Sequence, residues 1–228
     1  MRDKILNMFR LQEDLNKKIN PDWRKVRTKE DFSRATWIEC AELIDSLPWK
    51  WWKKMKANLD NVKIEIVDIY HFIMSYTLLD VKAPEEVLEH EDVEMFIKGY
   101  LEDFKNIDID GEYINHYLAE NEYYKKLIFL TERIAESFLK YNSYSGNFFF
   151  GLLLKNVMDF NQFYLLYMGK NILNHIRQEM GYNTGEYKKN INGLEDNEYL
   201  LQIVKNVDNE KVLEKKIREE FKKLQKEG

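Results

Sequence analysis

The chain has 228 residues, of which 44% are hydrophobic, and its 35 Lys and Arg against 40 Asp and Glu give a net charge of −5. This length fits one large domain or two small ones, and the hydrophobic content is enough for a real core. The acidic balance argues against a non-specific nucleic-acid binder, which needs a basic face. A single cysteine rules out a disulfide framework and indicates a cytoplasmic protein. The first residues are too highly charged for a signal peptide, and no apolar run is long enough to predict a membrane span.

Only 9 Gly and 3 Pro interrupt the chain, which favours long helices over a many-turned β architecture. Apolar residues spaced three and four apart predict helices, in chain order, over 2–19, 31–47, 61–79, 84–105, 112–141, 148–180 and 197–225. The segment 148–180 is either one long helix or two abutting helices. A turn is predicted at 143–146 and a structured loop over 182–197. The sequence therefore predicts one all-α domain, a single multi-helix bundle that spans 1–228.

Residue types at the predicted helix ends suggest where some helices begin and end. Asp31 or Ser33 should cap the start of the second helix, and Asn58 or Asp60 the start of the third, because their side chains accept hydrogen bonds from free backbone amides. Gly181 should take a left-handed conformation and end the long helix before it.

Two pairs of acids share a spacing of three residues. Glu39 and Glu42 lie on the second predicted helix, and Glu65 and Asp68 lie on the third. Acids three apart share one helical face, and the third helix is so apolar that its carboxylates need partners. A divalent cation shared by all four carboxylates would be such a partner, and all-oxygen ligation suits Mg²⁺, with Mn²⁺ as a substitute. Ion pairs with nearby Lys or Arg side chains are the alternative.

Polar side chains elsewhere suggest a ligand with phosphates and a base. Lys170, Asn174 and Arg177 follow one stripe of a helix, and such a set can hold a polyphosphate, although a solvated basic face has the same spacing. Gln12 and Asn16 lie on the apolar stripe of the first helix, where their amides need partners. A nucleobase edge would supply these partners, and so would a neighbouring helix end.

The acids stand in Glu-Cys-Ala-Glu-Leu-Ile-Asp at 39–45 and Glu-Ile-Val-Asp-Ile-Tyr-His-Phe at 65–72, and 170–182 reads Lys-Asn-x-Leu-Asn-x-x-Arg-Gln-x-x-Gly-Tyr. Together with Tyr-Lys-Lys at 187–189 and Glu-Asp-Asn at 195–197, these segments resemble the dimeric deoxyuridine triphosphatases of the all-α nucleoside triphosphate pyrophosphatase superfamily. The acid pattern is shared across the superfamily, whereas the Lys-Asn block is narrower and indicates the deoxyuridine or deoxycytidine branch.

The resemblance implies a homodimer with its active site between helices, which binds dUTP, or alternatively dUDP or dCTP, and uses Mg²⁺ to release dUMP and diphosphate. By position, the family's metal ligands correspond to Glu39, Glu42, Glu65 and Asp68. The residues that line its base and deoxyribose pocket correspond to Gln12, Asn16, Trp49, His71 and Asn174. Those around its phosphates correspond to Lys170, Arg177, Tyr182, Lys189 and Asn197. Glu39 is predicted to be the general base, with Glu42 as the alternative. One residue departs from the family pattern, since Ile191 stands where a Trp is expected.

Two other functions stay open at this stage. One is a dCTP/dUTP pyrophosphatase or a less selective house-cleaning enzyme, which a panel of nucleotides would distinguish. The other is a metal-free helical interaction module, whose acids pair with lysines and whose Trp49, Trp51 and Trp52 form a partner face. Such a module would show no dependence on magnesium.

Overall fold

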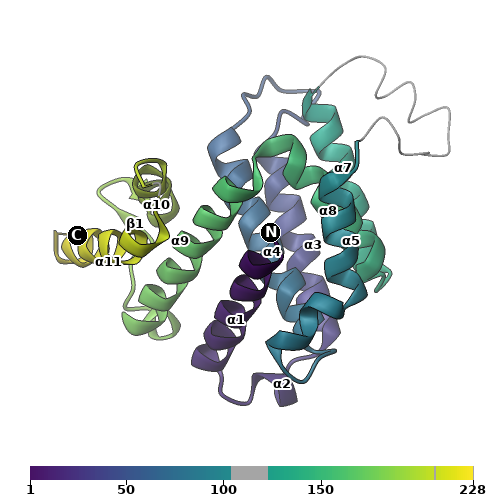
Figure 1. Cartoon of the computed structure of the whole chain (residues 1–228). Helices are drawn as coiled ribbons and strands as arrows, with labels where there is room; N and C mark the ends of the chain where they lie inside the picture. Colours follow the sequence, from purple (N-terminus) through teal and green to yellow (C-terminus); the bar gives the residue numbers. More distant parts are fainter. Residues whose placement is uncertain (104–122, 208, 228) are drawn as a thin grey trace. The chain divides into compact units, whose positions relative to one another are not determined.

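The computed structural model describes residues 1–103, 123–207 and 209–227, with side chains as far as 224, and its elements are drawn in Figure 1. The chain divides into a terminal unit, which combines Met1–Val26 with Asn161–Gly228, and a central unit, Arg27–Phe160. The described elements are helical apart from one two-stranded ribbon, which confirms the predicted all-α class. The single domain over 1–228 stays a prediction.

The terminal unit is built on two long helices that lie side by side. Its elements are α1 (Arg2–Ile19), α2 (Trp23–Val26), α9 (Phe160–Glu179), η3 (Tyr182–Thr184), β1 (Asn190–Ile191), β2 (Leu194–Glu195), α10 (Asp196–Lys205) and α11 (Glu210–Glu227). The hydroxyl of Tyr167 on α9 donates to the carbonyl oxygen of Met8 on α1 at 2.9 Å, and Asn7 donates to the hydroxyl of Tyr164 at 2.8 Å. The predicted first helix is confirmed.

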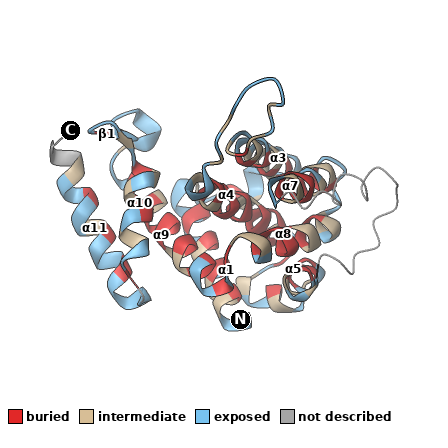
Figure 2. Ribbon diagram, turned by 90° about the horizontal axis from the view of Figure 1, so that it is seen from above, coloured by how far each residue is buried: buried red, intermediate tan, exposed pale blue. Residues whose placement is uncertain are grey.

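The central unit is a helical bundle around α4. Its elements are α3 (Lys29–Asp45), α4 (Leu59–Leu78), η1 (Pro84–Glu89), α5 (Glu91–Leu101), α7 (Tyr123–Leu139) and α8 (Ser143–Val157). Helix α3 packs against α4 and α7, while α8 packs against α4, α5 and α7. Figure 2 shows α4 buried along nearly its whole length, as its apolar sequence predicts.

Aromatic side chains fill the core where α4, α5 and α8 meet. The ring of Tyr70 stacks on Phe150, with centroids 5.0 Å apart, and lies 5.2 Å from the ring of Phe96. Helices α5 and α8 approach most closely at Gly99 and Gly151, where a Cβ atom on either glycine would collide with the backbone of the other helix. The glycines therefore allow the contact that closes this core.

The start of α3 differs from the prediction. Neither Asp31 nor Ser33 is the N-cap, because Thr28 takes that position and Asp31 accepts a hydrogen bond from its backbone amide at 3.1 Å. The two residues form a reciprocal capping box, which begins the helix two residues earlier than predicted. Asn58 is confirmed as the cap of α4, since its side chain accepts from the amide of Asn61 at 3.1 Å.

The predicted turn at 143–146 is wrong. Asn142 caps a helix there by accepting from the amide of Ser145, so α8 begins at Ser143. Of the two possibilities for 148–180, the structure shows two helices, because the backbone is extended at Met158. Gly181 has φ of 80°, which confirms the predicted left-handed cap.

Three more predicted segments are modified by the structure. The predicted helix over 197–225 is two helices, since α10 ends at Lys205 and α11 begins at Glu210. The predicted fourth helix is divided, because Pro84 begins the short helix η1 and the His90 side chain caps α5. The predicted loop over 182–197 contains the small β1–β2 ribbon. The first part of the predicted helix over 112–141 lies outside the described residues, and the rest is α7.

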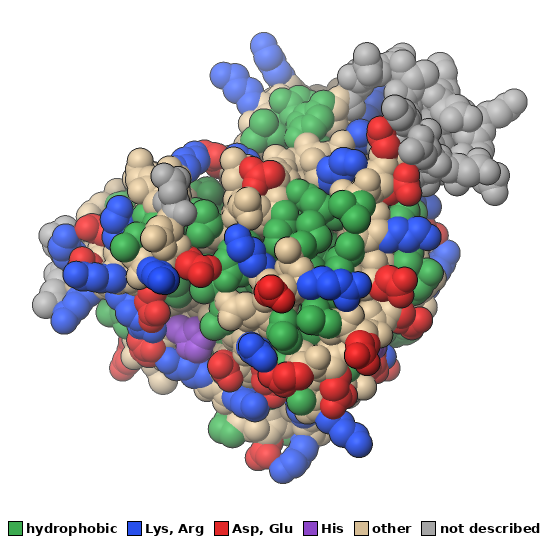
Figure 3. All heavy atoms as spheres, viewed as in Figure 1, with side chains coloured by type: hydrophobic (Ala, Val, Ile, Leu, Met, Phe, Trp, Pro, Cys, Tyr) green, Lys and Arg blue, Asp and Glu red, His purple; other side chains and the backbone are tan. Residues whose placement is uncertain are grey.

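The surface carries both signs of charge. On the face drawn in Figure 3, acidic and basic side chains are interspersed among the described residues. None of the described helices combines the length and the apolar character that a bilayer crossing requires.

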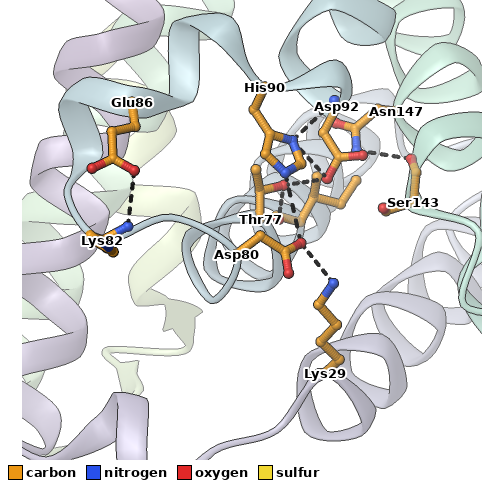
Figure 4. Close-up of polar contacts among 10 residues, drawn as sticks. Lys29, Thr77, Asp80, Lys82, Glu86, His90, Asp92, Ser143 and Asn147 are labelled. Atoms are coloured by element: carbon orange, nitrogen blue, oxygen red, sulfur yellow. Dashed lines mark hydrogen bonds and ion pairs between the residues drawn. The ribbon is translucent and has the colours of Figure 1, made fainter.

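A buried acid in the central unit is drawn in Figure 4. Asp92, at the start of α5, is fully buried, and one carboxylate oxygen accepts from the hydroxyl of Thr77 at 2.8 Å. His90 lies 3.7 Å from the same oxygen, and Asp80, which pairs with Lys29 at 2.6 Å, adds a like charge. Burial raises the pKa of the Asp92 carboxyl, although its bonds to hydroxyls and the nearby His90 oppose the shift.

We therefore expect Asp92→Asn to stabilise the protein at neutral pH. Because the folded-state pKa of Asp92 lies above its ordinary value, the unfolded chain releases this proton first, and stability falls as pH rises between those two pKa values. Asn keeps the shape and the bond to Thr77 without the charge, so the free energy of unfolding at pH 7 should rise by about 1–3 kcal/mol. Urea unfolding from pH 4 to 8 measures both effects. A variant less stable than wild type at pH 7, with an unchanged pH slope, would contradict the prediction.

Candidate active site

Three of the four predicted metal ligands come together in the central unit. Glu39 and Glu42 lie one turn apart on α3, and Glu65 lies on the adjacent α4. Each offers an oxygen atom, and these three atoms lie within 4.8 Å of one another. Glu65 is buried, Glu39 is half-buried and Glu42 is exposed, so the cluster runs from the protein interior to the solvent. Three converging carboxylates are an oxygen donor set that fits a hard divalent cation such as Mg²⁺.

Asp68 is not part of this group of three. It lies one turn beyond Glu65 on α4 and is half-buried. His71 follows one further turn along and is buried, with its backbone carbonyl accepting from the hydroxyl of Ser75 at 2.9 Å. The spacing of three places Asp68 on the face of α4 that carries Glu65, and His71 on the face that carries Asp68.

Cys40 stands next to Glu39 in the sequence but contributes no thiolate. Its side chain is fully buried, and burial, with a smaller contribution from the charge of Glu39, raises the pKa of the Cys40 thiol far above its ordinary value. A thiol that keeps its proton is a poor metal ligand. The donors of the cluster are therefore carboxylate oxygens alone.

Trp49 lies in the segment between α3 and α4. Its indole nitrogen donates to Asp45 at 3.1 Å, and its ring meets the edge of Trp52, with centroids 5.4 Å apart. Lys50 pairs with the same Asp45 at 2.7 Å and lies over the Trp49 ring. Trp49 is 39% exposed, so part of its ring is accessible to solvent and to a planar group.

In the terminal unit, Arg177 is the centre of a polar network. Its guanidinium binds Asp196 through two hydrogen bonds of 2.9 and 2.8 Å, in the fork geometry that arginine makes with carboxylates. Nη1 donates to Asn174 at 3.1 Å, and Nη2 is also 3.3 Å from the side-chain oxygen of Asn197. Lys170 donates to that same oxygen at 2.8 Å. Four residues predicted from the sequence therefore belong to one network.

The other two predicted phosphate residues lie beside this network. Tyr182 has the guanidinium of Arg177 5.9 Å and the ammonium of Lys189 5.3 Å from its ring centroid. The carbonyl oxygen of Lys189 accepts from the amide of Asp196 at 2.8 Å. The loop after α9 thus returns to the start of α10, and one cation from α9, Arg177, and one from the loop, Lys189, lie near the same aromatic ring.

Gln12 and Asn16 are joined by a hydrogen bond on α1. The Gln12 nitrogen donates to the Asn16 side-chain oxygen at 3.0 Å, and the Gln12 oxygen lies 3.3 Å from the hydroxyl of Tyr167. Both amides are buried among the apolar residues of α1 and α9. The partners are thus a residue of the same helix and Tyr167 from the middle of α9, neither of which is the helix end or the nucleobase that the sequence left open.

Sequence reasoning missed Asp196. It is 1% exposed and binds both Arg177 and the hydroxyl of Tyr187, the latter at 3.0 Å. Burial and the charge of Asp196 together raise the pKa of the Tyr187 hydroxyl. In the sequence, Asp196 resembles an ordinary acid at a helix start, so its partner nineteen residues away gave no local signal. Ile191, in the place where the family pattern has Trp, is buried in the β1–β2 ribbon.

A family model described as dUTPase matches residues 4–182 of the chain. The matched part includes all four predicted metal acids and the polar stripe of α9, whereas Lys189, Asp196 and Asn197 follow it. The comparison with curated proteins gives no match.

Proposed function

Because the chain belongs to the dUTPase family, it is a hydrolase of phosphoric anhydride bonds, and we propose that it converts dUTP to dUMP and diphosphate with Mg²⁺ as cofactor. The observation that carries the cofactor assignment is the convergence of Glu39, Glu42 and Glu65 within 4.8 Å. Three like charges at this distance repel one another unless a cation or protons neutralise them. Mn²⁺ has the same preference for oxygen ligands and should substitute.

The acidic cluster, with Asp68 one turn further on α4, would hold the metal. When bound, Mg²⁺ supplies positive charge that stabilises the developing charge on the phosphates. Glu39 is our candidate for the general base, because a half-buried carboxylate can reach water and still be held in place by α3. Glu42 is more exposed, which favours a ligand role over a fixed proton acceptor.

The nucleotide is assigned to two further groups of residues. Lys170, Arg177, Tyr182, Lys189 and Asn197 would bind the phosphates, and Gln12, Asn16, Trp49, His71 and Asn174 would bind the base and deoxyribose. The phosphate assignment is supported by two cations, Lys170 and Arg177, held on one face of α9 by Asn197. The base assignment is supported by buried amides, which discriminate strongly among hydrogen-bonding edges.

The direct test is the release of diphosphate from dUTP by the full-length protein, with and without Mg²⁺. The proposal expects one diphosphate for each dUMP and a rate that returns when Mg²⁺ or Mn²⁺ is added after chelation. Release of phosphate with dUDP as product would contradict the proposed reaction. Full activity in chelator would contradict the cofactor.

Hydrolysis of dCTP as well as dUTP is the second candidate function. It is favoured by the Gln12–Asn16 pair, in which a rotation of both amides exchanges donor and acceptor at 3.0 Å. Such a pair could meet either the carbonyl of uracil or the amine of cytosine. The enzyme is further proposed to be a cytoplasmic homodimer, and neither nucleic acid nor a membrane is a proposed partner.

We expect the enzyme to favour dUTP over dTTP and UTP. Thymine has the same pairing edge as uracil and adds one methyl group, so its rejection is steric and should lower kcat/KM by about 10–200-fold. The 2′-hydroxyl of UTP must be desolvated in the sugar pocket, which lowers kcat/KM further. Steady-state kinetics on dUTP, dTTP, UTP and dCTP measures these ratios.

Equal kcat/KM values for dUTP and dTTP would contradict the base assignment and leave the metal assignment intact. Efficient hydrolysis of dCTP would instead favour the second candidate function. Gln12→Ala tests the base assignment separately from the metal assignment, because it removes one amide and leaves every acid of the cluster unchanged. It should reduce the preference for dUTP.

A further inference from the structure

One side chain joins the two helices that carry the acidic cluster. Asn61 lies in the first turn of α4, one turn before Glu65, and its side-chain nitrogen donates to Glu65 Oε1 at 2.9 Å. The same nitrogen donates to the hydroxyl oxygen of Ser46, the C-cap residue of α3, at 2.7 Å. An amide nitrogen has two hydrogens, so both bonds can form at once.

The contact continues on the α3 side. The hydroxyl of Ser46 donates in turn to the backbone carbonyl of Glu42 at 3.2 Å, and the Ser46 carbonyl accepts from the amide of Asn58 at 2.8 Å. Asn58 caps α4 by accepting from the amide of Asn61. A continuous chain of hydrogen bonds therefore runs from the backbone of Glu42 on α3 to the carboxylate of Glu65 on α4.

We propose that Asn61 is a positioning residue for the metal site, an inference that rests on the proposed function of Glu42 and Glu65 as ligands. Its amide holds Glu65 Oε1 and so fixes the rotation of the carboxylate, which leaves Oε2 outside the Asn61 contact. Its second bond ties that orientation to the end of α3. Hydrogen bonds to a ligating carboxylate fix its direction, and their loss commonly costs metal sites 10–100-fold in affinity or activity.

The two ends of the segment between α3 and α4 meet at this chain of bonds. Residues 47–57 leave α3 and return to α4, and the Ser46–Asn58 and Ser46–Asn61 contacts close this loop at its base. Trp49 belongs to this loop, so the same contacts help to determine its position relative to the end of α3. Asn61 therefore links the position of the cluster to the geometry of a neighbouring segment that the proposed function also uses.

The test is binding of Mn²⁺ to the full-length, nucleotide-free protein, followed through the electron paramagnetic resonance signal of the free ion. Asn61→Ala should weaken Mn²⁺ binding about tenfold and raise the Mg²⁺ concentration for half-maximal dUTP hydrolysis by a similar factor. Alanine favours helix, so the variant should keep its fold. Ser46→Ala, which removes only the α3 end of the chain, should weaken binding about two- to threefold, a smaller share of the same effect.

Asn156→Ala is the matched control, because Asn156 is a half-buried asparagine on α8 whose amide donates, among the described residues, to the carbonyl of Leu152 on its own helix. It should leave Mn²⁺ affinity unchanged. Wild-type affinity in Asn61→Ala and Ser46→Ala would overturn the positioning role while the proposed function stood. A wild-type protein that neither binds Mn²⁺ nor hydrolyses dUTP would overturn the proposed function, and the positioning role with it.

Discussion

Glu65→Gln is expected to reduce the rate of dUTP hydrolysis by about a thousandfold or more and to leave the protein folded. Glu65 is the buried member of the acidic cluster, and Gln has one neutral oxygen where the carboxylate has two charged ones. Loss of a charged ligand should cost about 4 kcal/mol of transition-state stabilisation, which corresponds to this factor. The Gln oxygen can still accept from Asn61, so the local packing should persist. The rate of dUTP hydrolysis at saturating Mg²⁺ measures the loss of activity, and a thermal melt shows whether the variant is folded.

The same variant should be more stable than wild type when no metal is present. Removing one of three close carboxylates lowers their mutual repulsion, so the melting temperature in chelator should rise. Glu94→Gln, an exposed position on α5, is the matched control and should change neither rate nor stability. Substantial residual hydrolysis by Glu65→Gln at saturating Mg²⁺ would show that Glu65 is not a ligand.

The acidic cluster could be predicted from the sequence because its geometry is mostly local. The spacing of Glu39 and Glu42 places them on one face of α3 in any α-helix, and an acid in the apolar α4 indicates a buried partner. Only the approach of α3 to α4 had to come from the tertiary structure. The structure accordingly brings Glu65 to this pair, while Asp68 lies one turn outside the group.

Contacts between distant residues could not be predicted in the same way. The side chain of Asn61 bonds to Ser46, fifteen residues earlier, and nothing in either residue's neighbourhood indicates the pairing. The predicted start of α3 was wrong for a related reason. Thr28, Asp31 and Ser33 are all good caps by residue type, and the reciprocal bond between Thr28 and Asp31 decides among them.

The network in the terminal unit shows a further limit of sequence reasoning. A Lys, an Asn and an Arg on one stripe are consistent with a phosphate site, and the structure does place Lys170, Asn174 and Arg177 in one network. Nothing in the residue pattern indicated that Asp196 binds the guanidinium. A structural role for Arg177 therefore has to be separated from a role in binding by experiment.

Arg177→Ala is expected to destabilise the protein by about 3–5 kcal/mol. Arg177 and Asp196 are both buried and share two hydrogen bonds, so removal of the guanidinium leaves a buried carboxylate without its main partner. Tyr187 still donates to Asp196, but one neutral hydroxyl cannot replace a charged fork. Urea unfolding at pH 7 measures the loss of free energy.

The double variant Arg177→Ala with Asp196→Asn separates lost charge pairing from lost packing. It removes both charges, so it should recover part of the stability that Arg177→Ala loses, whereas equal stability of the two variants would show that packing alone is at stake. Binding is tested in the same proteins. The proposed phosphate role adds a phosphate contact to a guanidinium whose Nη1 already donates to Asn174, so removal of Arg177 should weaken dUTP binding about tenfold or more and dUMP binding far less. Equal weakening of both nucleotides would mean that Arg177 supports the fold and does not contact the outer phosphates.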